Sequence, residues 1–134
     1  MDHFDSELDS DNILEFGFQN ICIATGAKWR VDGVSRQHVV PMPMDSAMPI
    51  YTPDDIMTGN MPEGSVVVYD DDHYYMGSVI AERIAALGHN VTLVTPQDTI
   101  SAWGYYTYDR WRTQSRLMDM GVTLIVSKTL KEFD

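Results

Sequence analysis

The chain has 134 residues, of which 44% are apolar, and it carries a formal net charge of −11 with an isoelectric point of about 4.5. This apolar content is enough for one domain with a core and excludes an intrinsically disordered chain. The acidic balance repels phosphate groups, so we expect neither a nucleic-acid partner nor binding to an anionic membrane.

The apolar runs and the cysteine usage indicate a cytoplasmic protein. No apolar run approaches the roughly 20 residues that a membrane-spanning helix needs. The first residues are acidic and polar, unlike a secretory signal. Cys22 is the only cysteine, so the chain can form neither an internal disulfide nor a site of several thiolates. It lies in the apolar run Ile21–Ala24, where we expect a small buried side chain rather than a reactive thiol.

The first half of the chain contains few periodic patterns. We expect residues 1–12 to be a frayed acidic terminus. Residues 13–64 form a second unit, in which Ile21–Ala24 is predicted to be a short buried strand. The rest of this unit, residues 27–64, is rich in proline and methionine and lacks the periodicity of a regular layer. It therefore reads as a long crossing between two structured regions.

One short helix is predicted within this crossing. Thr52 can cap its start, Pro53 suits the first helical position, and the acidic residues that follow favour the positive end of the helix dipole. Gly59 and Pro62 end the helix after about two turns.

Residues 65–134 alternate between apolar runs and helical patterns. Val66–Tyr69, Val91–Val94 and Val122–Val126 are typical of strands covered on both faces. Between the first two runs, apolar residues recur at helical spacing up to Gly88, with one charged member (Met76, Val79, Ile80, Arg83, Ile84 and Leu87). Between the last two runs lies a segment that is first aromatic and then amphipathic. Four of its residues would lie on one face of a helix (Trp111, Gln114, Leu117 and Met118).

This order predicts an α/β fold with a Rossmann-like βαβαβ parallel sheet and right-handed crossovers. It resembles a pyridine-nucleotide domain, preceded by one extra strand and a long crossing.

The turn after the first strand lacks the chemistry of a dinucleotide site. Counting back from Gly77 through the G-x-G-x-x-G pattern, the first two glycine positions fall on Asp72 and Tyr74. A tyrosine blocks the approach of a phosphate, and Asp70 and Asp71 add negative charge where an anion would bind. Two carboxylates a few ångström from a phosphate cost about 1 kcal/mol or more each. We interpret the turn as a dinucleotide site that has been lost, with Gly77 left as its packing glycine.

Metal binding is the alternative reading of Asp70–His73, because hard cations prefer clustered carboxylates. Consecutive residues at a strand end cannot all face one ion, however, and an acidic helix cap explains them equally well. The other histidines lack ligand spacing (His3, His38 and His89). We therefore predict no metal ligands. We also predict no catalytic residues, because the chain has no Ser-His-Asp order, no nucleophile elbow and no H-E-x-x-H motif.

Two segments carry a resemblance to known flavoproteins. Residues 17–27 resemble the apolar strand and ATG motif of flavoproteins with two dinucleotide domains. Residues 52–77, with the later run Ser101–Trp103, resemble the C-terminal region of the trimethylamine dehydrogenase group in the NADH:flavin oxidoreductase (old-yellow-enzyme) superfamily. That group includes dimethylamine, histamine, dimethylglycine and N-methylproline dehydrogenases or demethylases. The ATG motif is generic, whereas the glycine-poor turn is much more specific.

The resemblance implies a fragment of a larger enzyme. Its parent would carry an N-terminal barrel with FMN and a 4Fe-4S cluster, would bind ADP or FAD in the neighbouring domain, and would oxidatively demethylate or deaminate small amines. Thr25 and Gly26 match the ADP or FAD side of that neighbour. We expect this chain to hold no cofactor, to be inactive alone, and to have the remaining parent domains as partners. Surfaces that faced those domains would favour homo-oligomers.

Two other functions remain open from the sequence. The chain could be a stand-alone module that still binds ADP, FAD or NAD(P)H at the surviving helix N-terminus. It could also be a protein-interaction domain, because five aromatic residues crowd into nine positions, as at many interfaces (Trp103, Tyr105, Tyr106, Tyr108 and Trp111). We favour the simpler explanation, in which these aromatic residues cover the sheet edge or start the second helix.

Overall fold

The computed structural model describes residues 7–132 and contains a three-stranded parallel sheet. Its strands are β1 (Val66–Tyr69), β2 (Val91–Val94) and β3 (Thr123–Ile125), in the order β1-β2-β3. In register, Val66 lies opposite Val91 and Leu93 lies opposite Leu124. The predicted strand bounds are confirmed for β1 and β2, and β3 is one residue shorter than expected at each end.

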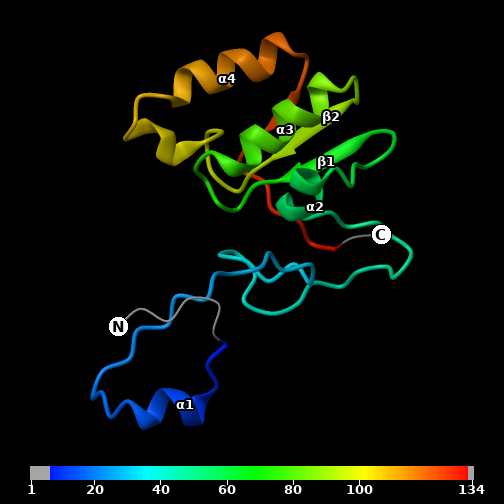
Figure 1. The fold of residues 1–134 in the computed structure, drawn as a ribbon. Coiled ribbons are helices and arrows are strands. Elements are labelled where there is room, and N and C mark those ends of the chain that lie inside the picture. Colours follow the sequence, from blue (N-terminus) through cyan, green and yellow to red (C-terminus); the bar gives the residue numbers. More distant parts are fainter. Residues whose placement is uncertain (1–6, 133–134) are drawn as a thin grey trace.

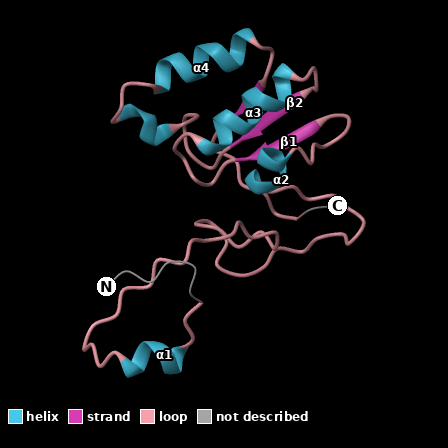
Figure 2. Cartoon of the chain, viewed as in Figure 1, coloured by secondary structure: helices cyan, strands magenta, loops and turns pink. Residues whose placement is uncertain are grey.

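Two helices connect these strands and lie on the same side of the sheet (Figures 1 and 2). Helix α3 (Met76–Ala86) joins β1 to β2. A short 3-10 helix, η1 (Ala102–Tyr105), and helix α4 (Arg110–Asp119) join β2 to β3. The predicted order of strand, helix, strand, helix and strand is confirmed, and with it the α/β class.

Helix α2 (Pro53–Thr58) forms where the sequence predicts it. The Thr52 hydroxyl accepts a hydrogen bond from the Asp55 N–H at 3.3 Å, and the Asp55 carboxylate accepts one from the Thr52 N–H at 2.8 Å. These reciprocal bonds satisfy two N–H groups that an uncapped helix would leave without partners. Gly59 ends the helix in the left-handed region with φ of 89°.

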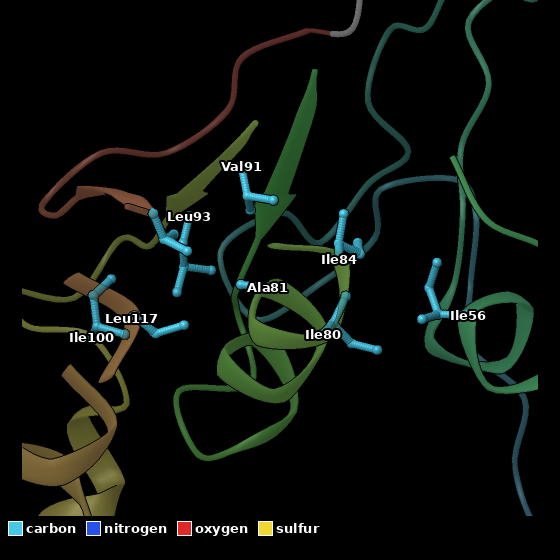
Figure 3. Packing of buried hydrophobic residues seen from close by; sticks show 9 residues of the cluster. Ile56, Ile80, Ala81, Ile84, Val91, Leu93, Ile100 and Leu117 are labelled. Atoms are coloured by element: carbon cyan, nitrogen blue, oxygen red, sulfur yellow. The ribbon is translucent and has the colours of Figure 1, made fainter. Parts of the chain in front are cut away.

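The core lies between the sheet and helices α3 and α4, and α2 adds one side chain to it (Figure 3). Its buried members come from six parts of the chain (Ile56, Ile80, Ala81, Ile84, Val91, Leu93, Ile100, Leu117 and Val122). Since isoleucine, leucine and valine dominate, burial of apolar area supplies most of the stability of this unit.

Both helices turn a slightly different face to the sheet than the periodicity suggests. In α3 the small residues Ser78 and Ala81 are buried, whereas Val79 is 50% exposed and Leu87 is also exposed. Small side chains let the helix approach the strands closely, so they take the inner positions. In α4 Gln114 and Leu117 face inward as expected, but Trp111 and Met118 are exposed, so that part of the prediction was wrong.

The predicted buried strand at Ile21–Ala24 was wrong. These residues have no regular secondary structure, Ile23 is 81% exposed, and Cys22 is exposed rather than buried. A strand needs a hydrogen-bonded neighbour, and the three described strands pair only with one another. The arm of residues 7–31 instead extends away from the α/β unit (Figure 1).

The arm contains one helix that the sequence analysis missed. Helix α1 (Ser10–Glu15) begins after Asp9, whose carboxylate accepts a hydrogen bond from the Asn12 N–H at 2.9 Å. Residues 1–6 of the predicted frayed terminus lie outside the described residues. The division into residues 1–12, 13–64 and 65–134 stays a prediction. None of the described helices is long and apolar enough to span a membrane.

Candidate functional site

The candidate site comprises residues 70–77, which run from the end of β1 into the first turn of α3, and we call it the aspartate turn. Asp70, directly after β1, is only 2% exposed. One of its carboxylate oxygens, Oδ1, accepts hydrogen bonds from the N–H groups of Asp72 and His73, both at 3.1 Å. The Asp70 N–H itself donates to the Val94 carbonyl at 2.8 Å, which fixes the residue beside β2. The carboxylate therefore organises the turn from within.

His73 sits in an unusual backbone conformation that its neighbours hold in place. Its φ is 67°, in the left-handed region that L residues rarely adopt and that costs a residue about 1 kcal/mol or more. Its carbonyl accepts a hydrogen bond from the Trp103 N–H at 2.9 Å. Its ring is buried, and Nε2 lies 3.2 Å from a carboxylate oxygen of Asp71. Contacts on three sides thus compensate for the strained backbone.

Gly77 is required by the Asp70 side chain. A Cβ atom built on Gly77 would lie 2.5 Å from the Asp70 Cβ and 2.6 Å from its Cγ, closer than real carbon atoms approach. Helix α3 begins at Met76, so its first turn packs directly against the buried carboxylate. Only glycine leaves room for this contact.

The turn also holds polar atoms without hydrogen-bond partners. Burial raises the pKa of the Asp70 carboxyl above its ordinary value, while the hydrogen bond from the His73 N–H partly offsets this shift. The second Asp70 oxygen and Nδ1 of His73 are buried and accept or donate no hydrogen bond. Within residues 7–132, no group of three or more histidine, cysteine or acidic side chains is arranged to hold a metal ion.

The geometry of the aspartate turn does not fit a bound dinucleotide. A phosphate at the start of α3 would need the free N–H groups of the turn. Two of those groups already donate to Asp70, and no glycine stands at position 72 or 74. The turn can therefore support the sheet and helix, and the N–H groups of Asp72 and His73 are not available to an anion.

Thr25 and Gly26 lie elsewhere, on the exposed arm. Gly26 has φ of 81°, and nothing lies within 4 Å of a Cβ atom built on it. The described residues therefore form no cradle for ADP or FAD around this pair. The structure does not bring Thr25 and Gly26 together with Gly77 in one site.

The sequence did not predict how the aromatic cluster (Trp103, Tyr105, Tyr106, Tyr108 and Trp111) is held. The Arg110 guanidinium stacks on the rings of Tyr105 at 5.2 Å and Trp111 at 4.5 Å. Arg110 also borders a small cavity of about 170 Å³ next to Tyr74 and Tyr75. Trp111 is nevertheless 66% exposed, so the cluster presents a large aromatic surface to solvent. An arginine among aromatic residues was the available signal for this arrangement.

Comparisons with known proteins show which family of domains the chain is similar to. Residues 51–131 match the family model described as the OYE-like second alpha/beta domain. The chain is 32% identical over 119 residues to a dimethylamine dehydrogenase of Hyphomicrobium sp. (strain x). This match covers 87% of the chain and 16% of that protein.

Two solved structures are also similar to the chain. Histamine dehydrogenase from Rhizobium sp. 4-9 is 47% identical with a TM-score of 0.84. The 6-hydroxypseudooxynicotine amine oxidase from Pseudomonas geniculata N1 is 38% identical with a TM-score of 0.82. Each match covers 97% of this chain but only 21% and 20% of the respective structures. The chain thus spans about a fifth of the length of these relatives.

Proposed function

The chain belongs to the family of OYE-like second alpha/beta domains, and we propose that it acts as a non-catalytic, Rossmann-like module of a longer flavin-dependent amine dehydrogenase. The observation that carries this proposal is the pair of coverages: 97% of this chain matches about a fifth of two enzymes that act on amines. A segment that small would leave the amine site, FMN and a 4Fe-4S cluster to other parts of the enzyme.

The aspartate turn supports a structural role for the module. In this proposal Gly77 is the remnant of a dinucleotide-binding turn, kept because it makes room for Asp70. Two of the turn's N–H groups bond to Asp70 rather than to a phosphate, and the neighbouring carboxylates would repel a phosphate. The module would therefore contribute shape and contact surface to the enzyme rather than a nucleotide site.

The exposed arm fits the same proposal. Phe18, Ile23 and other apolar side chains of the arm face solvent in this chain alone, although burying each would be favourable by about 1.5 kcal/mol or more. In the longer enzyme these side chains would pack on the neighbouring domain. Thr25 and Gly26 would then lie beside the ADP or FAD of that domain.

The two alternative functions differ in their support. A stand-alone nucleotide-binding module is disfavoured by the acidic turn and by its two N–H groups that already bond to Asp70. A protein-interaction domain is favoured by the exposed aromatic cluster around Arg110 and is compatible with a module that contacts other domains. Homo-oligomers of the isolated chain would form through the same surfaces.

Sequencing the transcript that encodes the chain tests the module proposal directly. We expect one reading frame that continues well beyond the 134 residues and encodes a flavin-dependent enzyme. A transcript whose reading frame encodes these 134 residues alone would contradict the proposal.

Calorimetric titration of the chain separates the module from a nucleotide-binding domain. We expect no binding of NADH, NADPH, ADP or FAD tighter than about 10 μM, which corresponds to about 7 kcal/mol. Titration of a known NADH-binding dehydrogenase under the same conditions serves as the positive control. Saturable binding of any of the four nucleotides with a dissociation constant below about 10 μM would refute our interpretation of the aspartate turn.

A further inference from the structure

A segment of the crossing, Ser35–His38, lies over the ends of the strands. It is held as a compact turn, because the Ser35 N–H donates to the His38 carbonyl at 2.8 Å and the His38 N–H donates to the Ser35 hydroxyl at 3.3 Å. We call this segment the strap. It contacts each of the three chain segments that follow a strand, and these contacts come from different residues.

The first contact is to the segment after β1. The Gln37 N–H donates to the Asp71 carboxylate oxygen Oδ2 at 3.0 Å. The other oxygen of Asp71 lies 3.2 Å from Nε2 of His73. The Asp71 side chain is only 8% exposed, so the strap and His73 together cover a carboxylate that would otherwise be solvated. A hydrogen bond to a charged acceptor contributes about 1.5–3 kcal/mol.

The second contact is to the segment after β2. The Arg36 guanidinium lies 4.5 Å from the centre of the Trp103 ring in η1. Trp103 is itself fixed to the aspartate turn, because its backbone N–H donates to the His73 carbonyl and its ring packs edge-on against the His73 ring, with 6.2 Å between the ring centres. A guanidinium over an indole is attractive by about 0.5–2 kcal/mol, depending on how much water it loses.

The third contact is to the segment after β3. Nε2 of His38 lies 3.4 Å from the Thr129 hydroxyl, which also forms a hydrogen bond of 3.1 Å with the Tyr69 hydroxyl at the end of β1. The His38 ring packs edge-on against the Tyr69 ring at 6.4 Å. The strap therefore spans from η1, across the aspartate turn, to the C-terminal segment.

Open parallel α/β sheets bind ligands in the crevice outside the carboxyl ends of their strands. We propose that the strap is an intramolecular occupant of this crevice, which it closes, and that Asp71 is its latch. This inference goes beyond the proposed function, since it concerns how the chain closes its own crevice whether or not other domains are attached. It also assigns different tasks to adjacent acids: Asp70 holds the aspartate turn, and Asp71 holds the strap.

Limited trypsin digestion tests the latch. Arg36 is exposed, but cleavage after it requires the hydrogen-bonded turn of the strap to open into an extended form, whereas cleavage after Arg30, on the exposed arm, does not. Asp71→Ala removes the acceptor of the Gln37 N–H. We expect the rate of cleavage at Arg36 relative to Arg30 to rise about tenfold, since opening loses a charged hydrogen bond.

Asp72→Ala is the matched control. It makes the same change of charge one residue away, and the hydrogen bond of Asp72 to Asp70 uses its backbone N–H. We expect this variant to leave the cleavage ratio within twofold of the unaltered chain. An equal rise in both variants, or no rise in Asp71→Ala, would overturn the proposal.

Hydrogen exchange on the unaltered chain keeps the proposal testable if Asp71→Ala fails to fold. After correction for intrinsic rates, the backbone amide of Gln37 should exchange at least about tenfold more slowly than the backbone amide of Val39, a residue that is 84% exposed. Equal exchange at the two amides would mean that the strap is not latched.

Discussion

The packing of Gly77 on Asp70 makes Gly77→Ala the most informative substitution in the chain. The new methyl group would overlap Cβ and Cγ of Asp70, which lie 2.5 and 2.6 Å from its position. Either the start of α3 must move away from the sheet or the carboxylate must leave its place. In the second case the N–H groups of Asp72 and His73 lose their acceptor. The substitution therefore tests whether this contact organises the aspartate turn.

The expected cost follows from three effects. Overpacking a buried site costs about 1–3 kcal/mol. Displacing the carboxylate adds about 1.5 kcal/mol or more for each hydrogen bond to a charged acceptor. Alanine regains at most about 1 kcal/mol over glycine from helix propensity. We expect Gly77→Ala to lower the free energy of unfolding by about 3 kcal/mol, which for a chain of this size lowers the melting temperature by about 10 °C.

A double-mutant cycle measured by urea denaturation isolates the contact. Asp70→Gly removes every Asp70 atom that the new methyl group would meet, so Gly77→Ala should cost less than about 0.5 kcal/mol in that background. The coupling energy between the two positions should then reach about 2 kcal/mol. A Gly77→Ala chain with an unchanged urea midpoint would refute the reasoning, and so would an equal cost in both backgrounds.

Two further substitutions test the buried charge and the core. Burial raises the pKa of Asp70 above 3.8, so the folded chain binds this proton more tightly than the unfolded chain does. The contribution of Asp70 to the free energy of unfolding therefore falls as pH rises from about 3.8 through the raised pKa. Asp70→Asn keeps an oxygen for both N–H groups and should flatten this decline in urea midpoints between pH 4 and 7. An unchanged slope would contradict the assignment. Leu117→Ala should cost about 2–5 kcal/mol, because Leu117 is fully buried. Its exposed neighbour offers the control Met118→Ala, which should stay within about 0.5 kcal/mol. Equal losses would mean that α4 does not pack through Leu117.

Local sequence signals predicted the elements that depend on local contacts. The bounds of β1, β2 and α2 could be read from β-rich runs, a capping threonine and a terminal glycine. The absence of a strand at Ile21–Ala24 could not be predicted, because a strand forms only where another strand supplies hydrogen bonds. Periodicity alone did not predict which face of α3 is buried, because apolar side chains occur on two neighbouring faces of the helix. The buried face is the one that contains Gly77, where the helix approaches Asp70 closely.

Only part of the candidate site could be predicted from the sequence. The glycine count identified Gly77 as the packing residue, but it did not find that Asp70 is what packs there. A signal was present, because an aspartate often accepts hydrogen bonds from N–H groups two or three residues later. The contact between Gln37 and Asp71 had no such signal. It joins residues 34 positions apart through a backbone N–H group, which any residue other than proline could supply.

If the turn descends from a phosphate site, as we propose, the acidic run supplies new acceptors for its N–H groups. A dinucleotide-binding turn holds N–H groups that a phosphate satisfies, and removing the ligand for good would leave those buried donors unpaired, at a cost of about 1–3 kcal/mol each. Here Asp70 satisfies two N–H groups of the turn, whereas Asp71 accepts the Gln37 N–H of the strap, which lies outside the turn. The Asp70 carboxylate would thus take the place of a ligand's oxygens. Glycines restored at positions 72 and 74 would therefore leave the N–H groups of residues 72 and 73 bonded to Asp70 and unavailable to a phosphate.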